Sequence, residues 1–381
     1  MTIESKLPRV GTNIFTIMSA LAEQHKAINL SQGFPNFDTP EPLKDLVNHY
    51  MQEGKNQYAP MAGLPILRGR LADKIGKLYG ADVDPTDEIT ITVGGSQALF
   101  TAIMAFVKAG DEVILIEPCY DSYAPSVALC GGKVVPYRLE APDFEIDWAV
   151  FSTLITSKTR MIVINTPHNP TGKTLKINDL ENLEKITEGS DILILSDEVY
   201  EHLIFDGQRH ESILRHPNLW KRSIAAFSFG KTFHATGWKM GYLVAPSHLT
   251  GEFRKVHQFN VFSVNTPMQY AIADYLADEN TYLSLPDFYQ NKRDFFLKAM
   301  QGSRFVPLSS EGTYFQLFDY QHISDENDLD FVKRLTTEHG VAAIPISVFY
   351  SNATADAKII RLCFAKTEVT LSEAAERLKV I

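Results

Sequence analysis

The chain has 381 residues, of which 45% are hydrophobic and 22% are charged. At roughly 100–200 residues per domain, this length predicts about two domains with room for a large core. The formal net charge of −10 disfavours nucleic acid or an anionic membrane as the main partner.

The chain begins with about 40 residues that read as irregular and rich in loops, and then alternates strand-like and helix-like segments. Short apolar runs predict strands that are buried on both faces of a sheet, at residues 88–93, 112–117, 160–165, 191–196, 223–227 and 240–244. Helical patterns lie between several of them, as at residues 96–108 and 177–188. This alternation predicts a mainly parallel α/β sheet flanked by helices.

The pattern changes from about residue 285. It becomes helix (291–300), strand (313–319), helix (329–338), strand (359–364) and helix (371–378). We interpret this as a second, smaller α+β domain, which the N-terminal segment completes. The expected division is a large domain at residues 41–284 and a small domain made of residues 1–40 and 285–381.

The cysteines and the first ten residues indicate the cellular compartment of the protein. Cys119, Cys130 and Cys363 have the spacing of neither a zinc site nor a redox pair, so free thiols in a reducing compartment are expected. The first ten residues lack the apolar core of a signal peptide, and no run of 18 apolar residues predicts a membrane span. These features favour the cytoplasm.

Polar motifs follow five of the predicted strands. They are Gly94-Gly95-Ser96-Gln97, Pro118-Cys119-Tyr120-Asp121, Thr166-Pro167-His168-Asn169-Pro170-Thr171-Gly172, Asp197-Glu198-Val199-Tyr200 and Ser228-Phe229-Gly230-Lys231. The carboxyl ends of parallel strands lie along one edge of a sheet, where open α/β sheets bind ligands. We therefore expect these motifs to converge on one crevice.

The first of these motifs predicts an anion site. Two glycines and a helix that opens at Ser96 would present backbone N–H groups to a phosphate, although an ordinary turn is the alternative. The spacing fits neither a dinucleotide fingerprint nor a P-loop.

Asp197 ends an apolar strand, where a carboxylate is costly to bury without a partner. It is either a helix N-cap or the counter-ion of a buried cationic nitrogen. Tyr200, three residues on, reaches the same ligand if the segment turns helically, or else is a core tyrosine.

Three cations stand out. Lys231 follows a buried strand, so desolvation should lower its pKa and suit it to Schiff-base chemistry, unless it is a surface lysine. Lys239 is a second cation suited to a phosphate. Arg361 lies inside a predicted strand and is either part of an internal salt bridge or a clamp for a substrate carboxylate.

Taken in order, these motifs resemble the signature series of the class I and II pyridoxal 5′-phosphate (PLP) aminotransferases, which are fold type I transferases. The matching residues are Asn165-Thr166-Pro167-His168-Asn169-Pro170-Thr171-Gly172, Asp197-Glu198-Val199-Tyr200, Ser228-Phe229-Gly230-Lys231, Gly237-Trp238-Lys239-Met240-Gly241-Tyr242 and Arg361. Finer features resemble the kynurenine/glutamine/methionine aminotransferase branch, and bacterial methionine aminotransferases within it. They are Ser31-Gln32-Gly33-Phe34-Pro35-Asn36-Phe37, Gln57-Tyr58-Ala59-Pro60 and Phe262-Ser263-Val264-Asn265-Thr266-Pro267.

The resemblance implies a mainly parallel seven-stranded sheet, PLP as the cofactor, no metal, and specific roles for residues. Lys231 resembles the Schiff-base lysine that also carries the proton. Asp197 resembles the partner of the ring nitrogen, and Asn169 and Tyr200 resemble the donors to the ring 3-oxygen. Tyr120 resembles the aromatic residue stacked on the ring.

The remaining implied positions hold the phosphate and the substrate. The phosphate site would consist of Gly95, Ser96, Gln97, Ser228 and Lys239, with Tyr58 given by the other subunit of a homodimer. The substrate α-carboxylate would lie on Arg361 with Gly33 and Asn169, and an apolar pocket would be lined by Phe34, Tyr58, Tyr120 and Phe262. Pro118 and Pro170 occupy positions where the family often has cis peptide bonds.

The expected reaction moves the α-amino group of an uncharged or aromatic L-amino acid to a 2-oxo acid. Methionine is the preferred donor, ahead of glutamine, aromatic amino acids and kynurenine. A cysteine-S-conjugate β-lyase on the same fold is the alternative enzyme. A non-enzymatic PLP-binding regulator is disfavoured, because the chain is acidic and has no basic N-terminal module.

Overall fold

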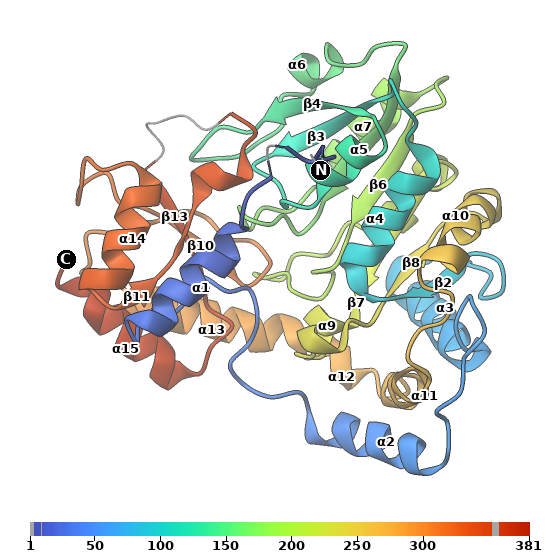
Figure 1. Cartoon of the computed structure of the whole chain (residues 1–381), viewed down its shortest axis with the longest axis horizontal. Helices are drawn as coiled ribbons and strands as arrows, with labels where there is room; N and C mark the ends of the chain where they lie inside the picture. The colour runs from blue at the N-terminus through green and yellow to red at the C-terminus, as the bar shows by residue number, and fades with distance from the viewer. Residues whose placement is uncertain (1–3, 9, 353–357) are drawn as a thin grey trace.

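A seven-stranded sheet lies at the centre of the larger part of the molecule (Figure 1). The computed structural model describes residues 4–8, 10–352 and 358–381. In spatial order the strands are β2 (Ile89–Thr92), β8 (Gly241–Val244), β7 (Ser223–Ser228), β6 (Leu193–Asp197), β5 (Thr159–Asn165), β3 (Glu112–Glu117) and β4 (Lys133–Arg138). All neighbours are parallel except β8, which runs antiparallel to β7 and to β2. The predicted mainly parallel sheet is confirmed.

Helices cover both faces of this sheet because both faces are apolar. Ile114 and Ile116 of β3 belong to one core, whereas Val113 and Leu115 belong to the other. Helices α3 (Pro65–Tyr79) and α7 (Ile177–Thr187) contribute buried side chains to the first core, and α4 (Gly94–Phe106), α5 (Tyr123–Leu129) and α10 (Ser247–Asn260) contribute them to the second. This two-sided burial explains the unbroken apolar runs of the sequence.

Strand β4 was not among the predicted strands. It lies at the sheet edge, pairs only with β3, and is buried mainly at Tyr137. Pro136 within it cannot donate a ladder hydrogen bond, which an edge strand tolerates. An exposed, proline-containing strand lacks the apolar run that marked the others.

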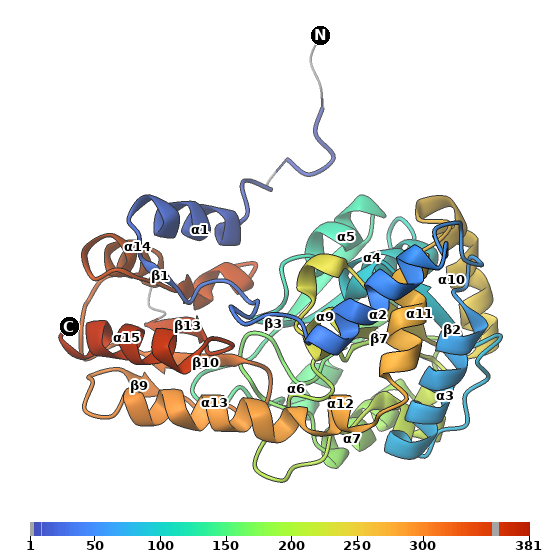
Figure 2. The same cartoon turned by 90° about the horizontal axis from the view of Figure 1, so that it is seen from below.

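A four-stranded antiparallel sheet forms the second part of the molecule (Figure 2). Its strands are β12 (Ile344–Pro345), β13 (Ile359–Cys363), β10 (Phe315–Asp319) and β9 (Val306–Pro307). The helices that accompany it are α13 (Leu285–Ala299), α14 (Asp328–Glu338) and α15 (Glu368–Lys379). The predicted helices and strands after residue 285 are thus confirmed, with ends shifted by a few residues.

The expectation that residues 1–40 are irregular was wrong in part. Helix α1 (Ile14–Gln24) begins at Asn13, whose side chain accepts a hydrogen bond from the Phe15 N–H. Strand β1 (Ile28–Asn29) exists only through its parallel pairing with β11 (Val341–Ala342), a contact that no local pattern could reveal. This pairing supports the grouping of the N-terminal segment with the C-terminal part, and the domain boundaries near residues 40 and 285 stay a prediction.

The other helices are short or connect the two parts. They are α2 (Glu41–Gln52), α6 (Trp148–Ser152), α8 (Pro217–Trp220), α9 (Phe229–Thr232), α11 (Thr266–Tyr275) and α12 (Asn280–Leu283). The peptide bonds before Pro118 and Pro170 are cis, as the resemblance implied, and so are those before Pro142 and Pro167. Within the described residues, no helix is both long and apolar enough to cross a membrane.

A buried ion pair behind the sheet fixes the segment that follows β6. The Glu201 carboxylate accepts hydrogen bonds from Lys74 Nζ at 2.5 Å and from the Tyr242 hydroxyl at 3.0 Å, and the Lys74 and Glu201 side chains are 4% and 3% exposed. The Glu198 carboxylate likewise accepts hydrogen bonds, from the Ser196 hydroxyl and the Ile213 N–H. These anchors leave the preceding Asp197 and the intervening Tyr200 free to line the cavity at the carboxyl edge of the sheet.

Candidate active site

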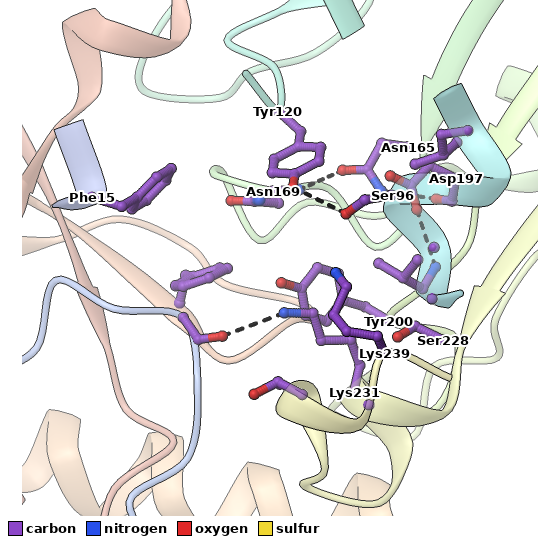
Figure 3. Close-up of a pocket in the computed structure, with 18 of the residues that line it drawn as sticks. Phe15, Ser96, Tyr120, Asn165, Asn169, Asp197, Tyr200, Ser228, Lys231 and Lys239 are labelled. Atoms are coloured by element: carbon purple, nitrogen blue, oxygen red, sulfur yellow. Dashed lines mark hydrogen bonds between the residues drawn. The ribbon is translucent and has the colours of Figure 1, made fainter. Parts of the chain in front are cut away.

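A cavity of about 270 Å³ lies at the carboxyl edge of the seven-stranded sheet, and Figure 3 shows side chains from several elements converging on it. All five strand-end motifs contribute to its wall, as predicted. The predicted site residues that line it are Gly33, Gly95, Ser96, Tyr120, Asn169, Asp197, Tyr200, Ser228, Lys231, Lys239 and Arg361.

One end of the cavity is built to bind an anion. Helix α4 begins there at Gly94, and no side chain caps its first turn, so its N–H groups are free for a ligand. A Cβ on Gly95 would lie 2.7 Å from Val199 Cγ1, so only glycine fits this close approach. Ser96, Ser228 and Lys239 add two hydroxyls and a cation.

Asp197 lies in the wall as a buried carboxylate, 3% exposed. Burial raises its pKa to about 6, although the Tyr123 hydroxyl donates a hydrogen bond to Oδ2 at 2.5 Å. The raised pKa means that the ionised form lacks a cation close enough to offset desolvation. A ligand with a cationic nitrogen would supply one.

Lys231 enters the cavity from α9. Burial lowers its pKa to about 8, so the neutral amine is well populated at slightly alkaline pH. Its Nζ donates to the Tyr314 hydroxyl at 2.8 Å and to the Gly33 carbonyl at 3.3 Å. The expected desolvation of this lysine is confirmed.

Two tyrosines flank the cavity. The Tyr120 hydroxyl lies 3.3 Å from the Ser96 hydroxyl, so it has a partner at the anion end. Tyr200 is buried, and its ring centre lies 5.5 Å from Lys231 Nζ. Both residues line the same cavity as Lys231 and Asp197.

Arg361 is a buried cation, 1% exposed, on β13. Its Nη1 donates to Asn169 Oδ1 at 2.7 Å, its Nη2 donates to the Ser31 carbonyl at 3.3 Å, and its Nε has no partner. Within the described residues, no carboxylate lies within 4.0 Å of the guanidinium. The ring of Phe315 lies 3.8 Å from it instead. Of the two alternatives left open by the sequence, this arrangement favours a carboxylate clamp.

Four predicted residues lie away from the cavity wall. The Gln97 side chain accepts from the Val93 N–H and donates to Thr101, so it points into the protein. Phe34 is 44% exposed and lies near Lys366. Tyr58 and Phe262 are 81% and 51% exposed and contact each other with ring centres 5.3 Å apart.

Sequence reasoning missed several residues of the site. Phe15 and Gln32 line the cavity from the N-terminal segment, and Asn165 lines it from the end of β5. Tyr123 contacts Asp197, and Tyr314 contacts Lys231. Asn165 and Gln32 stand inside motifs of the resemblance, and Tyr123 follows Tyr120 at helical spacing, whereas Phe15 and Tyr314 had no local signal.

The residues present fit PLP. A buried carboxylate, an uncapped helix start with a close-approach glycine that forms an anion cup, and a desolvated amine line the same cavity. The fold and the site together define a PLP-dependent enzyme of fold type I.

The chain belongs to the aminotransferase class I and II family, whose model matches residues 25–378. It is 52% identical to the methionine aminotransferase of Escherichia coli (strain K12), over 99% of this chain and 97% of that protein. It is 34% identical to human kynurenine–oxoglutarate transaminase 1, over 98% and 97% of the two chains. The crystal structure of Escherichia coli YbdL, for which a methionine aminotransferase function has been identified, superimposes with a TM-score of 0.98 at 51% identity and covers 100% of both chains. The protein is therefore a PLP-dependent aminotransferase.

Proposed function

We propose that the enzyme transfers the α-amino group of a large uncharged amino acid, with methionine preferred, to a 2-oxo acid. The observation that carries this proposal is Arg361, a buried cation without a carboxylate partner in the described part of the chain, in the same cavity as Lys231. Such a group fits the carboxylate that amino acids and 2-oxo acids share. The methionine aminotransferase function assigned to the similar Escherichia coli sequence and to the similar Escherichia coli crystal structure supports methionine as the donor.

We assign the cofactor contacts from the geometry of the wall. Asp197 would hold the cationic ring nitrogen and Asn169 and Tyr200 would donate to the ring oxygen, since all three line the cavity. The α4 start, Ser228 and Lys239 hold the phosphate. When bound, PLP supplies an electron sink that makes the Cα proton of the substrate removable.

Lys231 binds the cofactor and moves the proton. With its pKa lowered to about 8, Nζ is partly neutral at mildly alkaline pH and can accept the substrate Cα proton. Arg361 and Asn169 hold the carboxylate and thereby orient Cα toward Nζ. Tyr120 and Phe15 line the cavity, where their rings would exclude water from the bound substrate.

We expect methionine to be used with a kcat/KM on the order of 10–100-fold above that of aspartate, since a second substrate carboxylate would have to be buried without a cation. The cationic side chains in the described wall are Lys231, Lys239 and Arg361, and each is already assigned. A panel of amino acids with several 2-oxo acid acceptors measures this. A preference for aspartate would contradict the proposal. Pyruvate and a thiol released from cysteine S-conjugates without any acceptor would favour the β-lyase instead.

We further propose a homodimer in the cytoplasm, with Tyr58 completing the partner's site. Tyr58 and Phe262 form an exposed aromatic pair, and the Thr266 hydroxyl donates to the Gln57 carbonyl at 2.6 Å, so two motifs of the resemblance meet on this surface. Large exposed aromatic side chains of this kind favour a protein interface. The three cysteines are free thiols, which supports a reducing compartment.

Mixing inactive Lys231→Ala with inactive Tyr58→Ala should restore about a quarter of the parent activity. Random exchange makes half of the dimers mixed, and each mixed dimer has one of its two sites intact. The measurement is the transaminase rate after the two variants have exchanged subunits. The parent mixed with either variant serves as the control. Sites built within single chains would give no recovery.

A further inference from the structure

Tyr314 immediately precedes β10, and its hydroxyl lies next to the amine of Lys231. Its backbone carbonyl accepts a hydrogen bond from the Phe364 N–H, which ties it to the neighbouring β13 segment. Its ring is fully buried and meets the Tyr200 ring edge-on with centres 5.2 Å apart. The side chain is therefore held in one place, and its hydroxyl points at Lys231.

The hydrogen bonds around this hydroxyl have a defined direction. The Tyr314 hydroxyl donates to the Gly33 carbonyl and accepts from Lys231 Nζ at 2.8 Å, and the Tyr200 hydroxyl is a further hydrogen-bond partner of Tyr314. Burial raises the pKa of Tyr314, so it stays a neutral phenol in this arrangement. Nζ also donates to the Gly33 carbonyl at 3.3 Å.

These two acceptors orient the amine. A neutral amine has two N–H bonds and one lone pair. If both N–H bonds point to Tyr314 and Gly33, the lone pair is left for the cavity that Lys231 lines. The lone pair is what adds to an aldehyde carbon or accepts a proton.

We propose that Tyr314 is a positioning residue that holds the Lys231 amine with its lone pair toward the cavity, both for capture of the cofactor aldehyde and for proton transfer. The inference rests on the proposed role of Lys231. In the capture step the nitrogen adds to the aldehyde carbon, and the aldehyde oxygen leaves as water with the two amine hydrogens. Until the amine reacts, the Tyr314 hydroxyl oxygen and the Gly33 carbonyl oxygen accept hydrogen bonds from its two N–H groups.

The experiment compares Tyr314→Phe with Tyr289→Phe in cofactor-free protein. Tyr289 is equally buried, its ring centre lies 5.9 Å from that of Tyr314, and its hydroxyl bonds His234 Nδ1 instead of Lys231, so this variant is a matched loss of a buried hydroxyl. Unfolding curves establish that both variants are folded. Tyr314→Met, which also lacks the hydroxyl, provides a second test.

The first readout is the pKa of Lys231, from the pH dependence of its labelling by a small amine reagent. Loss of an acceptor that favours the charged amine should lower this pKa by roughly one unit in Tyr314→Phe and leave it unchanged in Tyr289→Phe. The other titratable groups that act on this amine are Cys363, Arg361, Lys239 and Asp197, with Tyr200 and Tyr314 adjacent, and all are retained in the control.

The second readout is the rate of PLP capture at a pH where the amine is neutral in every variant. We expect about a tenfold slower capture in Tyr314→Phe, because only orientation differs there. A Lys231 pKa that matches the parent in Tyr314→Phe, together with a capture rate within twofold of the parent, would overturn the proposal. Borohydride reduction and peptide mapping separate this failure from that of the proposed function, since PLP trapped at a residue other than Lys231 would reject the anchor itself.

Discussion

Replacing Lys231 by alanine should lower the transamination rate on the order of 10⁴-fold or more. The change removes both the amine that binds the cofactor and the base that moves the Cα proton, and a general base alone contributes ~10²–10⁴-fold. No other amine is placed to substitute, because Lys239 lies at the anion end of the described wall. A single-turnover assay of the PLP-loaded variant with methionine measures the loss.

The matched control for this prediction is Lys221→Ala, at an exposed lysine ten residues earlier in the chain. It should keep the parent rate, and both variants should keep the parent unfolding midpoint in the absence of cofactor. A near-normal single-turnover rate in Lys231→Ala would reject the assignment of this lysine.

The catalytic edge of the sheet was predictable because its signals are local. Asp197 is the last residue of β6, and Lys231 and Tyr120 lie three residues after the ends of β7 and β3, so the parallel strands place all three at one edge. Order along the chain was therefore enough to bring these residues together. The same logic located the helix start at Gly94 within two residues.

The contacts that complete the site join segments far apart in the chain, and local patterns do not encode them. Tyr314 reaches Lys231, and Phe15 reaches the cavity, only after the second sheet and α1 pack against the first. No sequence pattern assigned a role to Lys74 or Glu201, yet they form a buried ion pair. A buried pair is recognised only when both partners are placed in space.

Arg361 is a residue whose burial the sequence predicts but whose partner it does not. Its position inside a strand predicted burial, but an arginine within an apolar strand is expected both for an internal salt bridge and for a substrate clamp. Only the spatial arrangement separates them, because the nearest polar partners are the Asn169 amide oxygen and the Ser31 carbonyl.

Replacing Arg361 by methionine should therefore lower kcat/KM for methionine about 10²–10³-fold, and do so for the 2-oxo acid acceptor as well. Loss of one partner of a buried charge pair costs about 2–5 kcal/mol, and the substrate carboxylate would be left unpaired in both half-reactions. Steady-state kinetics with each substrate varied in turn measure the effect. Arg209→Met, at an arginine with 61% of its side chain exposed, is the control and should be neutral.

Unfolding measurements distinguish this clamp from a structural role. If Arg361 stabilised the fold through an ion pair, its loss would lower the free energy of unfolding by about 3–5 kcal/mol. Burial lowers the pKa of Arg361 to about 10, because no carboxylate partner among the described residues offsets its desolvation. The buried cation therefore destabilises the unliganded fold. Arg361→Met should consequently be as stable as the parent or more stable, while it loses activity. A variant that is strongly destabilised but keeps its kcat/KM would show that the arginine serves the fold and not the substrate.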